Sequence, residues 1–195
     1  MVANEKWFGG GAGAGAGAFY DYQIEQSCRF DRASGSYMQR TLGTPSNIDK
    51  GTFSLWFKKT LNGAYIQLLH TYDGGGVNFM WYGFSTGVFR DTNSWGHLVS
   101  RVDTTQSSND DRVRVYLNGT QIAGLTGSIS QNTDYKLNKS GNTLYLGHNI
   151  GGPHTFSGYL AEVIFTDGQS YAPTQFGESK NGVWIPKDPS GTTFG

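Results

Sequence analysis

Residues 112–122 read RVRVYLNGTQI, and this stretch decides the fold. The odd positions within 113–117 are apolar and the even positions are polar or aromatic, which is the two-residue period of a strand with one buried face and one wet face. Asn118 and Gly119 follow at once, and both tolerate the positive φ that a type I′ turn requires at its two central positions. Residues 120–122 then begin a return strand. The stretch predicts a hairpin in an antiparallel sheet.

The neighbouring segment, residues 97–103 (HLVSRVD), alternates in the same way and supplies a second strand for a central sheet, joined to the hairpin by a polar loop at 104–111. Glycine, at 29 residues, is about twice as frequent as in average proteins, as expected for a chain with many tight turns. Further strands are predicted at 27–32, 36–41, 52–59, 64–71, 77–82, 87–90, 143–147 and 159–166. The first two flank residues 33–35, which predict a hairpin-like turn. The chain is therefore expected to be an all-β sandwich of two antiparallel sheets.

The two ends of the chain differ from this pattern. Residues 9–18 read GGGAGAGAGA, a tract without bulky side chains that suits an extended arm or a linker. We expect a Gly/Ala-rich N-terminal arm at 1–19, a sandwich at 20–187 and a C-terminal tail at 188–195. Within the last part of the chain, Pro173 predicts one short helical turn at 172–176, and residues 183–195 are interpreted as an irregular tail.

Composition excludes several classes of protein. Fifteen basic and fifteen acidic residues cancel, so no global field favours nucleic acid or an anionic membrane. The single cysteine, Cys28, excludes an internal disulfide and is expected to be a buried, inert strand residue. Glu5 and Lys6 interrupt the N-terminal region, and no apolar signal segment is visible, so we expect cytoplasmic synthesis and no membrane insertion.

Catalytic and metal-binding patterns are weak, and no catalytic residue, metal or cofactor is predicted. A glycosidase needs two carboxylates that face one cleft. Glu162 is the only glutamate within a predicted strand, and Asp167 lies at an odd offset from it, on the opposite face of a regular strand. We therefore expect Glu162 to be a structural or surface residue. His148 and His154 bracket one loop, but that loop contains no carboxylate to complete a metal site.

Aromatic residues between glycines in the middle of the chain are the candidate recognition surface. Aromatic faces can stack on sugar rings, and nearby carboxylates and amides can bind hydroxyl groups. The alternative is that alternate aromatics line the core and that the polar residues serve turns. The candidate ligand-binding residues are Tyr72, Asp73, Trp81, Tyr82, Asp91 and Asn93.

Several stretches resemble a known family. Residues 95–106 (WGHLVSRVDTTQ) and 111–121 (DRVRVYLNGTQ) resemble the core of laminin-G-like, or concanavalin A-like, jelly-roll domains, and residues 156–163 (FSGYLAEV) resemble a later strand of that family. Residues 164–178 (IFTDGQSYAPTQFGE) and 182–187 (GVWIPK) resemble the version of the domain found in tail-fibre and head-surface proteins of tailed bacteriophages.

The resemblance implies a jelly-roll sandwich on the surface of a virion. The first hypothesis is a structural protein, such as a capsid decoration protein, head fibre or short fibre, whose partners are other capsid or tail proteins. The second is a fibre tip that binds a receptor or a host-surface glycan, and the third is a glycan hydrolase. Symmetry among such proteins implies a homo-oligomer, with a trimer as the expected state. Docking on the particle is assigned to the N-terminal arm, through Trp7, Phe8, Gly9 and Gly11.

Overall fold

The computed structural model describes residues 19–61, 66–72, 77–83, 91–92, 94–122, 128–134, 138–148 and 155–194; for Ile66 and residues 77–83 it describes the backbone alone. Nearly all of the regular structure in these ranges is β. The strands in chain order are β1 (Cys28–Phe30), β2 (Met38–Thr41), β3 (Lys50–Lys59), β4 (Ile66–Tyr72), β5 (Val77–Gly83), β6 (Gly96–Asp103), β7 (Val113–Leu117), β8 (Thr120–Gln121), β9 (Thr143–Leu146), β10 (Gly158–Asp167), β11 (Gly177–Lys180) and β12 (Val183–Pro186).

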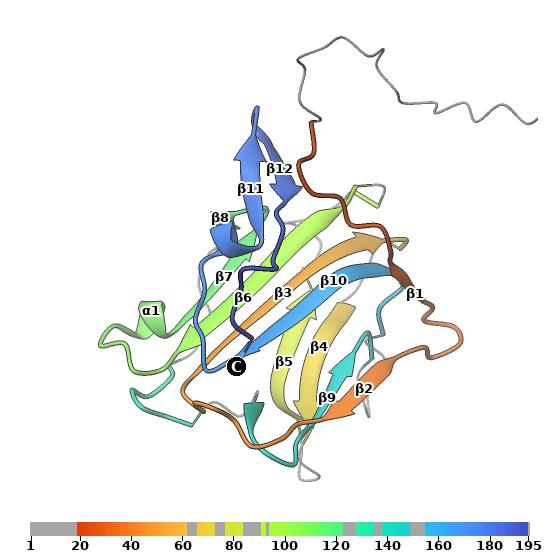
Figure 1. Cartoon of the computed structure of the whole chain (residues 1–195). Coiled ribbons are helices and arrows are strands. Elements are labelled where there is room, and N and C mark those ends of the chain that lie inside the picture. Colours follow the sequence, from red (N-terminus) through yellow and green to blue (C-terminus); the bar gives the residue numbers. More distant parts are fainter. Residues whose placement is uncertain are drawn as a thin grey trace, which may run out of the picture.

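Two antiparallel sheets face each other and form a jelly-roll sandwich, as predicted (Figure 1). The larger sheet has the order β1-β10-β3-β6-β7-β8, and the smaller has the order β2-β9-β4-β5. A separate two-stranded ribbon, β11-β12, stands beside the larger sheet (Figure 1). The described helical elements are one turn at α1 (Asn109–Arg112) and a 3₁₀ turn at η2 (Pro173–Gln175). Neither has the length or apolar character that crossing a membrane requires.

Alternation along the strands places the main core between the sheets. Phe53, Leu55 and Phe57 of β3 pack in one cluster with Val113 and Val115 of β7, and all five side chains are buried. These are the positions that the two-residue period assigned to the inner face. The remaining faces of β3 and β7 therefore point away from the smaller sheet.

The central hairpin is confirmed. Tyr116 pairs with Gln121 and Leu117 with Thr120, which leaves Asn118 and Gly119 as the two turn residues. Their φ angles are 48° and 77°, both positive as a type I′ turn requires. Pro173 begins the 3₁₀ turn η2, so the predicted short helical turn is confirmed as well.

The predicted hairpin around residues 33–35 is wrong. The chain does turn there, because Ser36 donates a backbone hydrogen bond to Asp31 at 3.1 Å. However, β1 pairs with β10 in the larger sheet and β2 pairs with β9 in the smaller sheet. The turn therefore carries the chain from one sheet to the other instead of joining two neighbouring strands.

The expectation for Cys28 is also wrong in part, because the residue lies in a strand but is exposed. β1 is the edge strand of the larger sheet and is hydrogen-bonded to β10 alone. A residue at the start of a three-residue edge strand has no neighbouring strand on its outer side to cover it.

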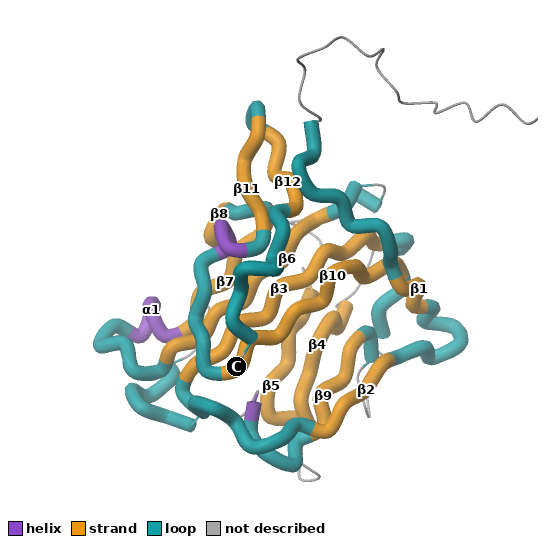
Figure 2. The backbone as a smooth tube through the Cα atoms, viewed as in Figure 1, coloured by secondary structure: helices purple, strands orange, loops and turns teal. Residues whose placement is uncertain are grey.

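The C-terminal region is a third correction, because residues 183–195 are not an irregular tail. β11 and β12 form a hairpin around Asn181 and Gly182, whose φ angles are 52° and 80°. Residues 188–194 then lie against the sandwich: Phe194 accepts a backbone hydrogen bond from Asp167 at 2.8 Å, and Thr192 is buried. Figure 2 shows these C-terminal strands and loops in front of the larger sheet.

The segment from η2 onward covers the outer face of the larger sheet. A second, smaller apolar cluster lies there, in which Phe176 packs with Val99, Tyr116 and Ile164. The larger sheet is therefore buried on both faces over part of its area. Near Trp56, residues 20–27 lie over this outer face and line a space together with the indole.

Candidate functional site

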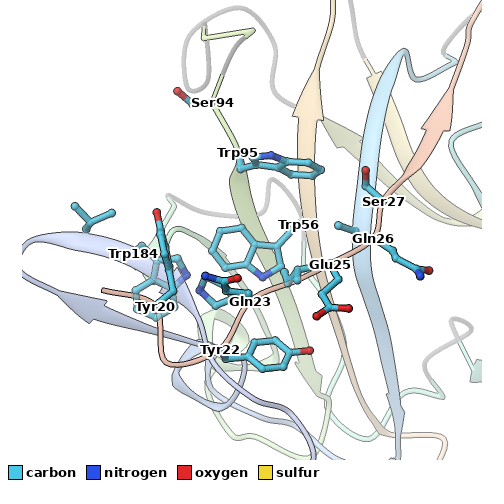
Figure 3. A pocket seen from close by; sticks show the side chains of 14 residues that line it. Tyr20, Tyr22, Gln23, Glu25, Gln26, Ser27, Trp56, Ser94, Trp95 and Trp184 are labelled. Carbon is cyan, nitrogen blue, oxygen red and sulfur yellow. The ribbon is translucent and has the colours of Figure 1, made fainter. Parts of the chain in front are cut away.

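A groove of about 640 Å³ lies on the outer face of the larger sheet (Figure 3). One wall is the segment 20–27, which we call the strap, and the rest comes from β3, β10 and β12 and from the two residues that precede β6. We refer to this site as the aromatic groove. Its lining residues are Tyr20, Tyr22, Gln23, Ile24, Glu25, Gln26, Ser27, Trp56, Ser94, Trp95, Ala161, Val183, Trp184 and Pro186.

Trp56 is in the groove because of its place in β3. Its neighbours Leu55 and Phe57 both belong to the core between the sheets, so Trp56 between them points to the outer face. On one side it stacks on His97 of β6, with ring centroids 4.6 Å apart and planes 15° apart. On the other side its partner in β10 is Ala161, which also lines the groove. The short alanine side chain leaves space beside the indole.

His97 links Trp56 to Trp184. The indole Nε1 of Trp184 donates a hydrogen bond to His97 Nδ1 at 2.9 Å, and the two rings are 18° from coplanar. Because an indole nitrogen only donates, Nδ1 must be the acceptor and the ring proton must be on Nε2. Nε2 then donates to Ser54 Oγ at 2.8 Å. Burial lowers the pKa of His97 to about 3, so the ring is neutral.

The central hairpin positions this histidine. Asn118 Oδ1 accepts a hydrogen bond from the backbone N–H of His97 at 2.8 Å, and the Asn118 N–H donates to the His97 carbonyl at the same distance. The turn that decides the fold thus also fixes the start of β6, next to Trp95.

Two glycines make room for Trp184. A Cβ atom added to Gly119 would lie 2.4 Å from the indole, and one added to Gly177 would lie 2.7 Å from it. Real Cβ contacts are not this short, so any larger residue would displace the ring. The hairpins β7-β8 and β11-β12 can therefore hold Trp184 against His97 only because both contact positions are glycine.

The strap is attached to the sheet by Tyr22. Its hydroxyl donates to Glu162 Oε1 at 2.7 Å. Glu162 has φ 43° and lies where the register between β10 and β3 shifts, which is a β-bulge. The bond to Glu162, together with burial, raises the pKa of Tyr22 to about 12. Burial raises the pKa of Glu162, and the Tyr22 hydrogen bond partly offsets that rise.

The bulge agrees with the expected structural role of Glu162. Asp167, the second carboxylate considered, accepts hydrogen bonds from Ser46 N at 2.6 Å and from Asn138 Nδ2 at 2.8 Å. Glu162 and Asp167 thus engage different hydrogen-bond partners. Within the part of the chain that is described, no three His, Cys, Asp or Glu side chains are placed to hold a metal ion.

The groove offers ring faces and neutral hydrogen-bonding groups, together with the carboxylate of Glu25. Trp95 and Tyr20 are 40% and 44% exposed. Gln23, Gln26 and Ser94 are exposed and supply amide and hydroxyl groups that both donate and accept. Figure 3 shows Gln23 beside the ring of Trp56, whereas the Gln26 amide and the Ser94 hydroxyl lie farther from the two indoles.

The ligand-binding residues expected from the sequence do not form this site. Tyr72 is half-buried at the end of β4, and the backbone of Trp81 and Tyr82 lies in β5, so all three belong to the smaller sheet. Asp91 is exposed and accepts a hydrogen bond from Ser94, which lines the groove. Asp73 and Asn93 lie outside the described residues, as do Trp7, Phe8, Gly9 and Gly11 of the expected docking arm.

A signal for the groove was present in β3. Residues 52–59 alternate, and Trp56 is the large aromatic on the face otherwise occupied by Ser54 and Lys58. A large apolar side chain on a solvent-facing strand face is normally shielded from water by another segment of the protein or by a ligand. The strap gave no comparable signal, because its contact with Glu162 joins residues that are 140 positions apart in the chain.

Comparison with known proteins found similar solved structures but no matching family model and no match among curated proteins. Domain 4 of AbnA, a GH43 extracellular arabinanase from Geobacillus stearothermophilus, is 21% identical with a TM-score of 0.45, and the match covers 65% of this chain and 64% of that chain. A heptameric SAP-like pentraxin from Limulus polyphemus is 16% identical with a TM-score of 0.47, covering 71% and 72%. The CBM40 of Ruminococcus gnavus IT-sialidase is 14% identical with a TM-score of 0.45, covering 78% and 97%.

Proposed function

We propose that this chain is a saccharide-binding β-sandwich and that the aromatic groove is its binding site. The observation that carries the proposal is the groove itself: about 640 Å³ of space bordered by Tyr20, Trp56, Trp95 and Trp184. Ligand sites are typically concave and rich in aromatic side chains, with a few polar groups that fix orientation. Both parts are present here, on a rigid sheet.

The polar groups match the needs of a sugar. A sugar ring has an apolar face of C–H groups and a rim of hydroxyls, so it suits an aromatic surface bordered by side chains that both donate and accept. Gln23, Gln26, Ser27 and Ser94 provide such groups. In addition, the buried Nε1 of Trp56 has no hydrogen-bond partner among the described residues. A buried donor without a partner is costly, and a ligand oxygen would satisfy it.

Glycan-array binding followed by calorimetry tests the proposal. Trp95→Ala should weaken binding by about tenfold, or roughly 1.4 kcal/mol, because a few aromatic anchors such as tryptophan carry much of the energy of a binding site. Ala161→Leu should also weaken it, because the larger side chain enters the space beside Trp56. Phe194→Ala removes an exposed aromatic that does not line the groove and serves as the matched control. Wild-type affinity in both groove variants would contradict the assignment of the site.

We propose binding without hydrolysis. The support is that Glu162 is engaged by Tyr22 in a bulge, whereas Asp167 is engaged by Ser46 and Asn138. A glycosidase requires two carboxylates on opposite sides of one scissile bond. Release of reducing sugar from a bound glycan, lost in Glu162→Gln, would overturn this part of the proposal.

We further propose that the sandwich is displayed on a bacteriophage particle, as a decoration protein or a fibre. The support comes from the sequence, through the resemblance of residues 164–178 and 182–187 to phage surface proteins. The partners would be capsid or tail proteins and further copies of the chain, in a trimer. Mass spectrometry of a purified virion tests this: hundreds of copies indicate decoration, a handful indicates a fibre, and absence of the chain would contradict display.

A further inference from the structure

The described residues that line the aromatic groove carry charge of one sign. Among the described residues that line it, Glu25 is the one with an ionisable carboxylate, and none carries a positive charge. Glu25 is exposed on the strap, and Figure 3 shows its carboxylate on the side of Trp56 where Tyr22 also lies. Any ligand that reaches the space beside Trp56 therefore meets a negative charge with no lining cation to offset it.

Other carboxylates add to this field. Glu162 lies behind Tyr22, at hydrogen-bond distance from its hydroxyl. The charges of Glu162, Asp188 and Glu25 all contribute to the raised pKa of Tyr22, so the three carboxylates act on the same wall of the groove. Lys180, a cation on the ribbon beside the strap, forms an ion pair with Asp21 at 2.9 Å. That pairing offsets its charge.

We propose that the aromatic groove selects by charge: it accepts neutral or amino-bearing sugar units and excludes saccharides that carry carboxylate, sulfate or phosphate groups, with Glu25 as the discriminating residue. This inference rests on the proposed saccharide-binding function and specifies its ligand class. Like charges brought together at a binding interface repel each other and weaken the complex. Recognition of an anionic sugar normally uses arginine or lysine, and the described lining has neither.

The test uses pairs of saccharides that share a backbone and differ in charge. The carboxyl methyl ester of 3′-sialyllactose is compared with 3′-sialyllactose itself, and methyl-esterified oligogalacturonides are compared with the same oligomers as free acids, by calorimetry at low ionic strength, where charge effects are least screened. The neutral member of a pair should bind about tenfold or more tightly than the acidic member, a difference of roughly 1.4 kcal/mol.

Substitution of Glu25 identifies the discriminating residue. Glu25→Gln should reduce the difference in affinity between the neutral and the acidic member of a pair. Glu25→Lys should abolish or reverse that difference. Asp110→Lys, the same type of change at an exposed acid in α1, should leave the difference intact. Equal or tighter binding of the acidic member to the wild-type protein would overturn the charge selection and leave saccharide binding standing. If neither these pairs nor a glycan array shows binding, the proposed function fails and this inference fails with it.

Discussion

Trp184 occupies its position because Gly119 and Gly177, which lie against its ring, have no side chain. Gly119 and Gly182 are both the second residue of an Asn-Gly turn, with φ angles of 77° and 80°. They differ in what surrounds them: a Cβ on Gly119 would lie 2.4 Å from Trp184, whereas a Cβ on Gly182 would have nothing within 4 Å. A substitution at Gly182 therefore tests backbone strain alone, whereas the same substitution at Gly119 tests backbone strain together with packing against the indole.

Gly119→Ala should therefore lower the free energy of unfolding by more than Gly182→Ala. Both variants incur the strain of a non-glycine residue at positive φ, roughly 1–2 kcal/mol. The Gly119 variant must also displace Trp184, which would break the hydrogen bond to His97. Denaturant unfolding measures the difference, and tryptophan fluorescence should change in the Gly119 variant alone. Equal destabilisation would mean that Trp184 does not pack on this turn.

His97 predicts a dependence of stability on acid pH. Its pKa is lowered from 6.5 to about 3 in the folded protein, so the unfolded chain binds a proton that the folded chain does not. The stability contributed by the neutral ring is complete above 6.5 and is lost as the pH falls from there toward 3. NMR of the ring carbons should show no titration of His97 between pH 7 and pH 5, in roughly the range where a free histidine titrates. A midpoint near 6.5 would contradict the buried, neutral assignment.

At the scale of elements, the strap depends on the bond between Tyr22 and Glu162. Tyr22→Phe keeps the ring and removes the hydroxyl, which leaves a half-buried carboxylate without this donor. The unfolding free energy should fall by about 1.5–3 kcal/mol, the range for hydrogen bonds to charged groups. Saccharide binding should weaken as well, since the strap is one wall of the groove. Tyr171→Phe removes a hydroxyl with a longer bond, 3.4 Å to Thr193, and serves as the control.

The same bond gives a prediction at alkaline pH. The pKa of Tyr22 is raised from 10.0 to about 12 in the folded protein, so folding favours the protonated phenol. Its contribution to stability is complete below 10 and is lost as the pH rises from there toward 12. Wild-type protein should therefore lose more stability over this range than Tyr22→Phe. If the free energy of unfolding falls equally with pH in both proteins, the Tyr22 hydroxyl does not form the hydrogen bond to Glu162.

Sequence patterns predicted the elements with long, regular alternation and missed those without it. The hairpin at Asn118 and Gly119 was found because residues 113–117 alternate before it. The hairpin at Asn181 and Gly182 has the same turn residues, but its strands, GESK and VWIP, are short and lack that alternation. The dipeptide alone was a usable signal, since both of its residues tolerate positive φ.

The site was less predictable than the fold because it joins distant parts of the chain. Trp56 could be assigned to the outer face from the period of β3, but the strap that lies beside it has no regular pattern. The bulge at Glu162 breaks the alternation on which the face of that residue was inferred. The aromatic residues between positions 72 and 89 were predicted to form a recognition surface because they are closely spaced in the sequence. Close spacing does not show which face of which sheet a side chain occupies.

At the scale of the whole molecule, the groove and the N-terminal arm are continuous in sequence. The strap begins at residue 20, directly after the expected arm, and it is tied to the larger sheet through Tyr22 and to the β11-β12 ribbon through the ion pair of Asp21 with Lys180. Residues 1–18, with Trp7 and Phe8 ahead of the Gly/Ala tract, lie outside the described residues. Docking on a particle and binding of a saccharide should therefore be separable by truncation between residues 18 and 20.

Deletion of residues 1–18 should leave a folded domain with a near-normal melting temperature and wild-type saccharide affinity, but without incorporation into particles. Deletion of residues 1–27 should in addition remove a wall of the groove and the hydrogen bond to Glu162. Its melting temperature should fall by about 2–4 °C for each kcal/mol lost, and saccharide binding should be lost. Calorimetry, a glycan array and the copy number in purified virions measure the three properties. An arm that docks on the particle loses conformational entropy when it becomes ordered, and its contacts with the particle must offset that loss. The deletion of residues 1–18 removes those contacts. If the protein without residues 1–18 is still incorporated at wild-type copy number, docking belongs to the sandwich.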